Sequence, residues 1–288
     1  FIVAGVSQGI FQGTFNWEPY QNGVPGGTIP KTIYLIQHSS AQQLSGGQLE
    51  TILIQNPNPV IALAATIVIF LIVAYVQATR VELPLSHGRA RGARGRYPLK
   101  LIYSSVLPVI LVSALLANIN LFAMLFYTND ALVNFPLIGH KWWIGMYNTG
   151  STEAIGGGAW YISRVKGIQE WLLPLISDKY SYLLTQGGVT HTKFQVIMHV
   201  IAHFSFMTIF AILFANFWIK TTNMDAASVA DQIQDSGMQI PGFRRDPRVL
   251  RKVLERYIPT ITNFSGFFIG ALAASANMLG TVGNTSGT

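Results

Sequence analysis

The sequence contains no cysteine, and charged residues make up only 11% of its 288 residues. The absence of cysteine excludes disulfide bonds and thiolate chemistry within this sequence. The shortage of charge argues against an ordinary soluble domain, in which about a quarter of the residues are charged. Half of the residues are hydrophobic. This composition indicates a protein whose main solvent is lipid.

Acidic and basic residues are absent from four apolar windows, each long enough to cross a bilayer as a helix, which takes about 20 residues. The windows are Pro59 to Thr79, Leu101 to Phe126, Phe194 to Ile219 and Ile258 to Val282. A fifth apolar stretch, Phe1 to Trp17, begins abruptly and shows neither the basic n-region nor the cleavage site of a secretory signal. We therefore expect it to be the end of a longer span, and five spans in all.

The segments between these spans differ in charge. Segment 80–100 carries six basic residues and one acidic residue, and segment 220–257 carries seven basic and five acidic residues. Because Lys and Arg near span ends are retained preferentially in the cytoplasm, both segments are predicted to be cytoplasmic. The alternation of spans then places segments 18–58 and 127–193 and the tail 283–288 outside.

The first basic segment has an unusual texture. Its stretch SHGRARGARGRYP, residues 86–98, carries four arginines separated mainly by glycine and alanine. The glycines are expected to keep the backbone flexible and exposed, and the guanidinium groups offer planar, bidentate contacts to phosphate. This texture favours a docking loop for a folded RNA or an acidic protein surface. The alternative is that the arginines only orient the neighbouring spans.

Helical patterns also occur outside the windows. Residues 225–239 have a helical composition, and residues 248–257 form a short basic amphipathic pattern that is expected to lead into the span at Pro259. The segment Gly167 to Leu184 combines Trp and Tyr with leucines. That combination is typical of a short helix or hairpin at the membrane surface.

The spans contain little material for chemistry. Without charged side chains they lack the groups that usually mark pumps and ion-coupled transporters. His199 and His203 are four residues apart and share a helical face, a spacing that suits a bis-imidazole metal or haem site. The glutamate of a zinc protease motif is missing between them, and no third ligand is evident. The alternative is a pair of buried histidines that are hydrogen-bonded to neighbouring helices.

Polar and helix-breaking residues interrupt the window Leu101 to Phe126. Asn118 and Asn120 are costly in hydrocarbon and are expected to face protein or water. Pro108 removes a backbone hydrogen bond and is expected to loosen this helix. The irregularity is either structural or allows the helix to move.

Four stretches occur in a specific order along the chain. They are FIVAGVSQGIF at 1–11, VELPLSHGRARGARGRYPLKLIYSSVLPVILVSALLANINLF at 81–122, DSGMQIPGFR at 235–244 and RYIPTIT at 256–262. In this order they resemble the SecY family, the pore subunits of the protein-conducting Sec translocon, and in particular its archaeal and eukaryotic branch. The resemblance covers almost the whole chain, although most of residues 129–190 is weakly diagnostic.

The resemblance implies an all-α polytopic membrane protein with a partial SecY-type helix bundle of about five transmembrane helices. These helices correspond to the family's fifth to ninth spans, so the first four spans, the plug and the tenth span are expected to lie outside this sequence. In the family the pore forms between two pseudo-symmetric halves. This chain is therefore not expected to enclose a pore by itself.

The resemblance also assigns the two basic segments. In the family, the loop between the sixth and seventh spans and the loop between the eighth and ninth spans dock the ribosome. Arg89 and Arg91 fall on the basic positions of the first loop, and Arg94 and Arg96 add charge to it. Arg244 matches the arginine of the second loop's Gly-x-Arg motif.

Channel residues follow from the same resemblance. The family's apolar pore ring matches Ile2 and Val6 on the first span and Leu107 and Ile110 on the third. These spacings put each pair on one helical face. A ring of branched aliphatic side chains is unfavourable for water and ions but yields to an extended peptide. Asn118 corresponds to a polar residue of the lateral gate, through which signal sequences reach the lipid.

The resemblance thus implies a channel subunit of the plasma membrane that translocates unfolded secretory polypeptides and releases signal or transmembrane segments into the membrane. No catalysis and no cofactor are expected. The implied partners are a SecE-like subunit, a second small Sec subunit, the ribosome, signal sequences and nascent chains, and membrane lipids. Two alternatives stay open: a small-molecule transporter or intramembrane metal or haem protein that uses His199 and His203, and a structural scaffold whose arginine segment only orients it.

Overall fold

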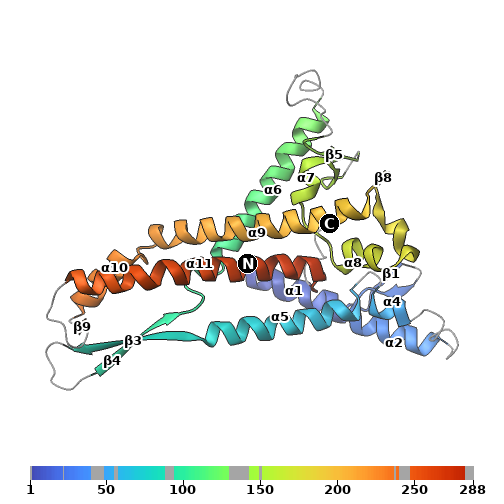
Figure 1. Cartoon of the computed structure of the whole chain (residues 1–288). Coiled ribbons are helices and arrows are strands. Elements are labelled where there is room, and N and C mark those ends of the chain that lie inside the picture. Colours follow the sequence, from blue (N-terminus) through green and yellow to red (C-terminus); the bar gives the residue numbers. More distant parts are fainter. Residues whose placement is uncertain are drawn as a thin grey trace. The chain divides into compact units, whose positions relative to one another are not determined.

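The computed structural model describes residues 2–21, 23–39, 49–54, 58–87, 94–129, 143–148, 151–236, 238–239 and 247–282. Within these residues, four helices are long and apolar enough to cross a membrane (Figure 1). They are α5 (Val60–Ala78), α6 (Leu107–Thr128), α9 (Lys193–Thr221) and α11 (Pro247–Leu279). The first predicted span contains α1 (Ile2–Phe15), which has 14 residues. The predicted helical polytopic fold class is confirmed.

The start of α6 differs from its prediction. The helix begins at Leu107, six residues after the start of the apolar window, and residues 101–106 form bends instead. Pro108 therefore lies in the first turn, where its missing N–H would have no helical acceptor in any case. The expectation that Pro108 loosens the interior of a span is wrong, because this proline lies where the helix begins.

The basic amphipathic helix continues directly into the last span, as predicted. The basic amphipathic pattern at 248–257 and the following span form one continuous helix, α11, with Pro259 inside it. A proline in a helix interior costs about 3 kcal/mol. Leu254 and Ile258 before Pro259 and Ile261 after it are all buried. Packing on both sides of the proline thus stabilises the uninterrupted helix.

The chain divides into two compact units. The first unit comprises residues 1–71, 118–203 and 274–288. Besides parts of the long helices, it contains α1 and the following short elements: β1 (Pro19–Gln21), β2 (Val24–Pro25), α2 (Thr28–His38), α4 (Leu49–Leu53), β5 (Met146–Tyr147), β6 (Ala154–Gly156), α7 (Gly157–Ile162), α8 (Ile168–Ile176), the 3-10 helix η2 (Asp178–Leu184), β7 (Thr185–Gln186) and β8 (Val189–Thr190). The three strand pairs are antiparallel, and a cluster of Ala123, Tyr147, Ala154, Ala159 and Trp160 forms a core.

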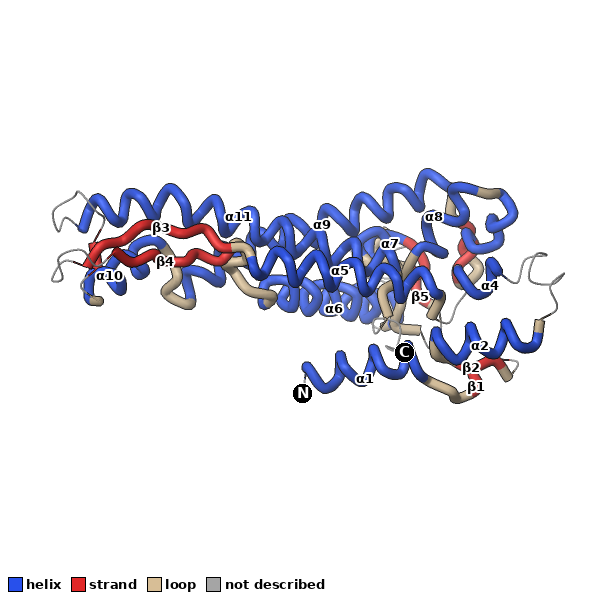
Figure 2. The backbone as a smooth tube through the Cα atoms, turned by 90° about the horizontal axis from the view of Figure 1, so that it is seen from below, coloured by secondary structure: helices blue, strands red, loops and turns tan. Residues whose placement is uncertain are grey.

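The second unit comprises residues 72–117 and 204–273. It contains a three-stranded antiparallel sheet in the order β4–β3–β9, formed by β3 (Arg80–His87), β4 (Arg94–Lys100) and β9 (Met238–Gln239). Figure 2 shows β3 and β4 side by side as a long ribbon. The short helix α10 (Ala226–Asp235) is capped by Asp225, whose carboxylate accepts a hydrogen bond from Ala227 N at 3.2 Å. The core consists of Ile219, Ala226, Val229, Ala230, Ile233, Leu250, Leu254 and Ile258.

In the second unit, α9 and α11 pack closely through glycine. The sequence GFFIG places Gly266 and Gly270 four residues apart on α11, the spacing with which small residues allow helix backbones to approach in membranes. A Cβ atom on Gly266 would lie 2.8 Å from Ile212 Cα, and one on Gly270 would lie 2.7 Å from Ala211 Cβ. The contact therefore has no room for a side chain at either glycine.

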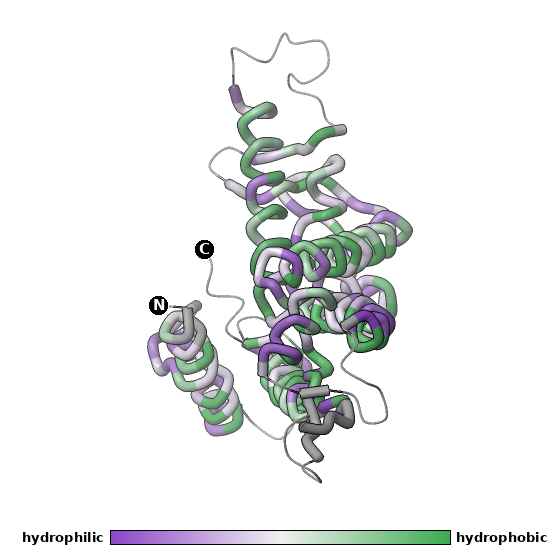
Figure 3. The backbone as a smooth tube through the Cα atoms, turned by 90° about the vertical axis from the view of Figure 1, so that its left-hand side faces the viewer, coloured by the Kyte–Doolittle hydropathy of each residue, from purple (hydrophilic) through white to green (hydrophobic). Residues whose placement is uncertain are grey.

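The four long helices differ in how much of their apolar surface the chain itself covers. Only 6% of the apolar window of α5 and 11% of that of α6 are buried, against 33% for α9 and 44% for α11. Figure 3 shows hydrophobic residues recurring along the length of α6. Exposed apolar surface of this extent is unfavourable in water. In a membrane protein, lipid or further protein segments cover such surface.

We expect Gly266→Ala and Gly270→Ala to destabilise the second unit by about 1–3 kcal/mol, because the added methyl group overpacks the contact with α9. The measurement is the midpoint of thermal unfolding of the full-length subunit in detergent. Gly5→Ala on α1 is the matched control, since a Cβ there meets no atom within 4 Å. Identical midpoints for all three variants would contradict the close packing.

Candidate functional site

The arginine-rich segment begins in β3 and ends in β4, and these two strands pair with each other. In the antiparallel ladder, Arg80 pairs with Lys100 at one end, and Ser86 pairs with Arg94 at the other. The flexible backbone predicted for residues 86–98 is thus wrong for residues 86–87 and 94–98, which belong to strands. The reason is a period of two in both strands, in which apolar positions alternate with polar ones. Sequence reasoning read the glycines and arginines here and missed this alternation.

Register separates the hairpin into two faces. Val81 pairs with Leu99, and Leu83 pairs with Tyr97, so apolar residues share one set of alternate positions. Arg94 and Arg96 occupy the other set, together with Arg80 and Lys100. The ladder therefore gathers basic residues at the positions opposite to the apolar ones.

The hairpin is anchored to the rest of the second unit. Leu99 is fully buried, and Tyr103, just beyond β4, donates a hydrogen bond from its hydroxyl to Met224 O at 2.8 Å. On the other edge of β3, His87 pairs with Met238 of β9. These contacts connect segment 80–100 with the segment between α9 and α11.

The pairing of β3 with β9 connects the two basic segments. β9 ends at Gln239, five residues before Arg244 in the sequence. Segments about 150 residues apart, each predicted from charge to lie on the same side of the membrane, thus meet in one sheet. Arg94 and Arg96 lie on β4, whereas Arg89, Arg91 and Arg244 lie outside the described residues.

The predicted pore residues lie at the start of two helices. Leu107 and Ile110 are in the first turn of α6, and these residues are 37% and 42% exposed. Ile2 and Val6 lie on α1, which belongs to the other unit. The structure therefore places each pair on its helix, and the ring that would join the two pairs stays a prediction.

A buried contact that sequence reasoning missed fixes the beginning of α6. The hydroxyl groups of Ser104 and Ser265 lie 2.9 Å apart, and both residues are fully buried. The next residue, Ser105, has a φ of 63°, a left-handed conformation that is strained for a residue other than glycine. Two serines 161 residues apart leave no periodic signal in a sequence, so only the structure shows that they meet.

The two asparagines of α6 have different surroundings. Asn118, the predicted gate residue, is exposed on the helix surface. Asn120 is half-buried, and its backbone carbonyl oxygen accepts a hydrogen bond from the Tyr147 hydroxyl at 3.0 Å. Its side-chain Oδ1 is buried without a hydrogen-bond partner among the described residues. Burial raises the pKa of Tyr147 to about 12. The surface position of Asn118 allows it to meet a segment from outside this chain.

The histidine pair is satisfied by hydrogen bonds. His199 Nε2 lies 3.1 Å from Ser163 O, and His203 Nδ1 lies 3.2 Å from Ile162 O. The other ring nitrogen of His203 is 3.3 Å from the Asn277 amide. Among the residues that the structure describes, no group of three His, Cys, Asp or Glu is arranged to hold a metal ion. The interpretation as buried, hydrogen-bonded histidines is confirmed.

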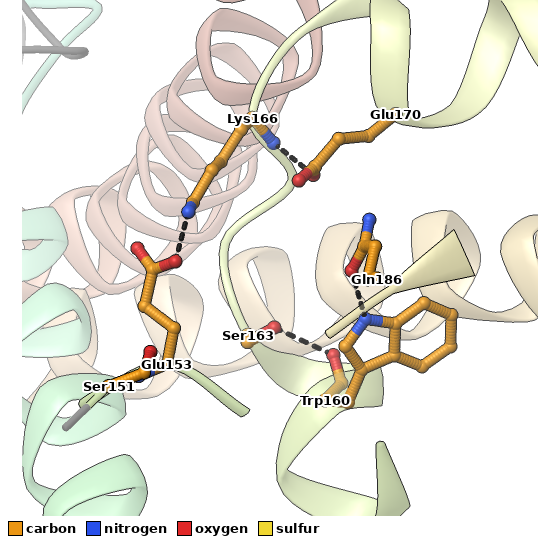
Figure 4. A network of polar contacts seen from close by, with 7 residues as sticks. All are labelled: Ser151, Glu153, Trp160, Ser163, Lys166, Glu170 and Gln186. Carbon is orange, nitrogen blue, oxygen red and sulfur yellow. Dashed lines mark hydrogen bonds and ion pairs between the residues drawn. The ribbon is translucent and has the colours of Figure 1, made fainter. Parts of the chain in front are cut away.

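Around these histidines, the segment predicted to be external is a folded structure (Figure 4). Trp160 is buried, donates from Nε1 to Gln186 Oε1 at 3.2 Å, and stacks on His191 with ring centroids 3.9 Å apart. Lys166 forms an ion pair with Glu153, and its backbone N–H donates to the Glu170 carboxylate at 2.6 Å. Desolvation by burial is the main cause that raises the pKa of Glu170. The predicted surface element at 167–184 consists of α8 and η2.

Comparison with known proteins decides the family. The SecY family model matches residues 1–288, which is the entire chain. The chain belongs to the SecY family. The resemblance predicted from four stretches is thereby confirmed, and this SecY-family chain is a multi-pass membrane protein.

Curated relatives named protein translocase subunit SecY share its sequence over its full length. It is 41% identical to the protein of Halobacterium salinarum and 39% identical to that of Archaeoglobus fulgidus, and it covers 55% of each relative. The chain thus spans about half the length of the curated relatives it matches. Both relatives are archaeal, which agrees with the predicted archaeal and eukaryotic branch.

Solved structures of the family have the same fold. One, described as "The structure of a protein conducting channel", matches with a TM-score of 0.62 and 32% identity, over 98% of this chain and 52% of that chain. Another, titled for the plug domain of the SecY protein, matches with a TM-score of 0.63 and 31% identity, over 98% of this chain and 53% of that chain. The helical bundle of this SecY-family chain is therefore the SecY fold in part.

Proposed function

We propose that this chain is part of a protein-conducting channel that translocates unfolded secretory polypeptides across the plasma membrane and releases signal or transmembrane segments into it. The observation that carries the proposal, beyond family membership, is the joining of the two basic segments in one sheet through β3 and β9. The function requires no covalent chemistry and no cofactor. Energy would come from translation or from another driving partner.

The proposed topology follows the charge of the loops. Segments 80–100 and 220–257 face the cytoplasm, because basic residues near span ends are retained there. Segments 18–58 and 127–193 and the tail 283–288 face outward. This topology puts the β3–β4 hairpin on the side where polypeptides are made.

The proposed docking surface is formed by the arginines around the hairpin tip and by the nearby Arg244. Its partner is the ribosome, because arginine binds RNA phosphate through bidentate contacts and tolerates desolvation better than lysine. The anchoring of the hairpin through Leu99 and Tyr103 supports this role, since a firmly held strand pair loses little conformational entropy when it binds.

The proposed aperture is a ring to which Ile2, Val6, Leu107 and Ile110 contribute. Exposed aliphatic side chains at the start of α6 support the assignment, because they are available to line a passage.

Further proposed parts are a SecE-like subunit and a second small subunit, which would complete the assembly, and signal sequences and nascent chains as its cargo. Asn118 is proposed as a polar element of the gate toward lipid.

Replacing Arg89, Arg91, Arg94 and Arg96 together by Gln is expected to weaken ribosome binding at least about tenfold. The affinity should also depend less on salt, because fewer phosphate contacts release fewer counterions from the RNA on binding. Co-sedimentation of ribosomes with the complete reconstituted subunit measures this. The charge-matched control removes four cations from the proposed outer side, at Arg164, Lys166, Lys179 and Lys193. Equal binding by wild type and the hairpin variant would overturn the docking role.

The pair Leu107→Ser and Ile110→Ser is expected to make the resting channel leak, because a hydrophobic constriction excludes ions by dewetting and hydroxyl groups hydrate it. Ion efflux from proteoliposomes that contain the complete channel is the readout. Leu121→Ser with Leu125→Ser, at two other exposed positions of α6, is the control. Leaks of the same size from both pairs would contradict a ring at the start of α6.

Asn118→Leu is expected to ease opening of the lateral gate. The substitution removes one hydrogen bond across the closed gate, and such a bond stabilises the closed state by about 0.5–1.5 kcal/mol. Transport of a precursor with a weakened signal sequence, relative to the unaltered precursor, should therefore rise roughly two- to tenfold. Asn118→Gln retains an amide and should stay near the wild-type ratio. An unchanged ratio for Asn118→Leu would exclude the gate role.

A further inference from the structure

A polar stripe follows one flank of the contact between α9 and α11. Its inner part is an amide pair, in which Asn216 Nδ2 donates to Asn263 Oδ1 at 2.6 Å and also to Ile212 O at 2.9 Å. Asn263 is exposed, and within the described residues its own amide N–H groups have no protein acceptor. Two amides at the surface of apolar helices are costly in hydrocarbon unless a polar partner meets them.

Helical register extends this stripe to two cations. Lys220 lies four residues after Asn216 on α9, and Arg256 lies seven residues before Asn263 on α11, so each shares the flank of its asparagine. Thr260, between Arg256 and Asn263, donates its hydroxyl to Arg256 O. Because the helices are antiparallel and join at the asparagines, Lys220 lies about 6 Å and Arg256 about 10 Å beyond the amide pair in the same direction, on the same flank.

The two cations have no acid of their own. Lys220 and Arg256 are both exposed, and none of the ion pairs in the described part of the chain involves either of them. The nearest acidic residue along α11, Glu255, accepts from Arg251 Nε at 2.8 Å. The end of the stripe is therefore a site of positive charge that is open to an anion.

Apolar side chains continue the stripe into the span. Phe217 on α9 is 61% exposed, and Phe264 and Phe267 on α11 are 45% and 48% exposed. Phe267 lies four residues after Asn263 and shares its flank, whereas Phe217 and Phe264 directly follow the two asparagines and lie on the adjoining exposed surface; all three are on the span side of the cations. Ile219 and Ile258, which belong to one buried cluster, mark the level at which both helices change from apolar to charged sequence.

We propose that Lys220, Arg256 and the Asn216–Asn263 amides bind one anionic phospholipid. The phosphate lies between the two cations, the amide of Asn263 donates to an ester oxygen, and the acyl chains lie along the exposed phenylalanines. The order of cation, amide and aromatic matches the order of groups along such a lipid. RNA fits this order less well, because it would leave the adjacent apolar side chains without a partner.

This site is independent of transport, and its binding can be measured whether or not the proposed channel activity is correct. The probe is phosphatidylglycerol, with phosphatidylcholine as the zwitterionic reference. The full-length subunit with its partners is titrated with each lipid in detergent, and bound lipid is counted by native mass spectrometry. Lys220→Gln with Arg256→Gln should weaken phosphatidylglycerol binding roughly 25-fold, at about fivefold for each cation near an anionic headgroup, and leave phosphatidylcholine unchanged.

The matched control is Arg80→Gln with Lys100→Gln, which removes one Arg and one Lys from the cross-strand pair at the base of the hairpin. It should retain phosphatidylglycerol binding, as should the charge-preserving pair Lys220→Arg and Arg256→Lys. Equal losses from the two Gln pairs would show general attraction by a basic surface and would overturn the site. Unchanged lipid binding with loss of ribosome binding in the Lys220 and Arg256 variant would assign these cations to RNA instead.

Discussion

Close packing of α9 against α11 holds the second unit together. Two glycines at GxxxG spacing bring the helices so near that a Cβ at either position would collide with α9. Within the same unit, Ser104 bonds to Ser265 on α11, and Tyr103 bonds to the chain just after α9. The start of α6 and the root of the hairpin are therefore attached to this helix pair, and their positions depend on it.

A second constraint, the cost of charge in hydrocarbon, decides where this protein can present polar chemistry. The four long apolar windows contain no charged residue, so the cations are concentrated in the connecting segments. In the β3–β4 hairpin, the basic residues occupy one set of alternate positions and the apolar residues occupy the other. The stripe along α9 and α11 uses cations at the border of the span. Both surfaces result from excluding charge from the interior of the membrane.

Part of the fold was predictable from particular residues. The apolar windows were sufficient to locate four long helices, and the order of four short stretches was sufficient to identify the family. The GFFIG sequence also indicates a close helix contact, because small residues four apart allow helix backbones to approach. The strands β3 and β4 were missed because glycine and arginine content was given more weight than the alternation of Val81, Leu83, Tyr97 and Leu99.

The sequence by itself determined which stretches enter lipid and which carry positive charge, because both depend on local composition and on the cost of moving charged groups into hydrocarbon. It did not determine which distant residues meet. The pairing of β3 with β9, the contact of Ser104 with Ser265 and the bonding of His199 and His203 to the chain at 162–163 were decided by the tertiary structure alone. Such contacts join single residues over long separations, and only the packing of whole helices brings them within hydrogen-bonding distance.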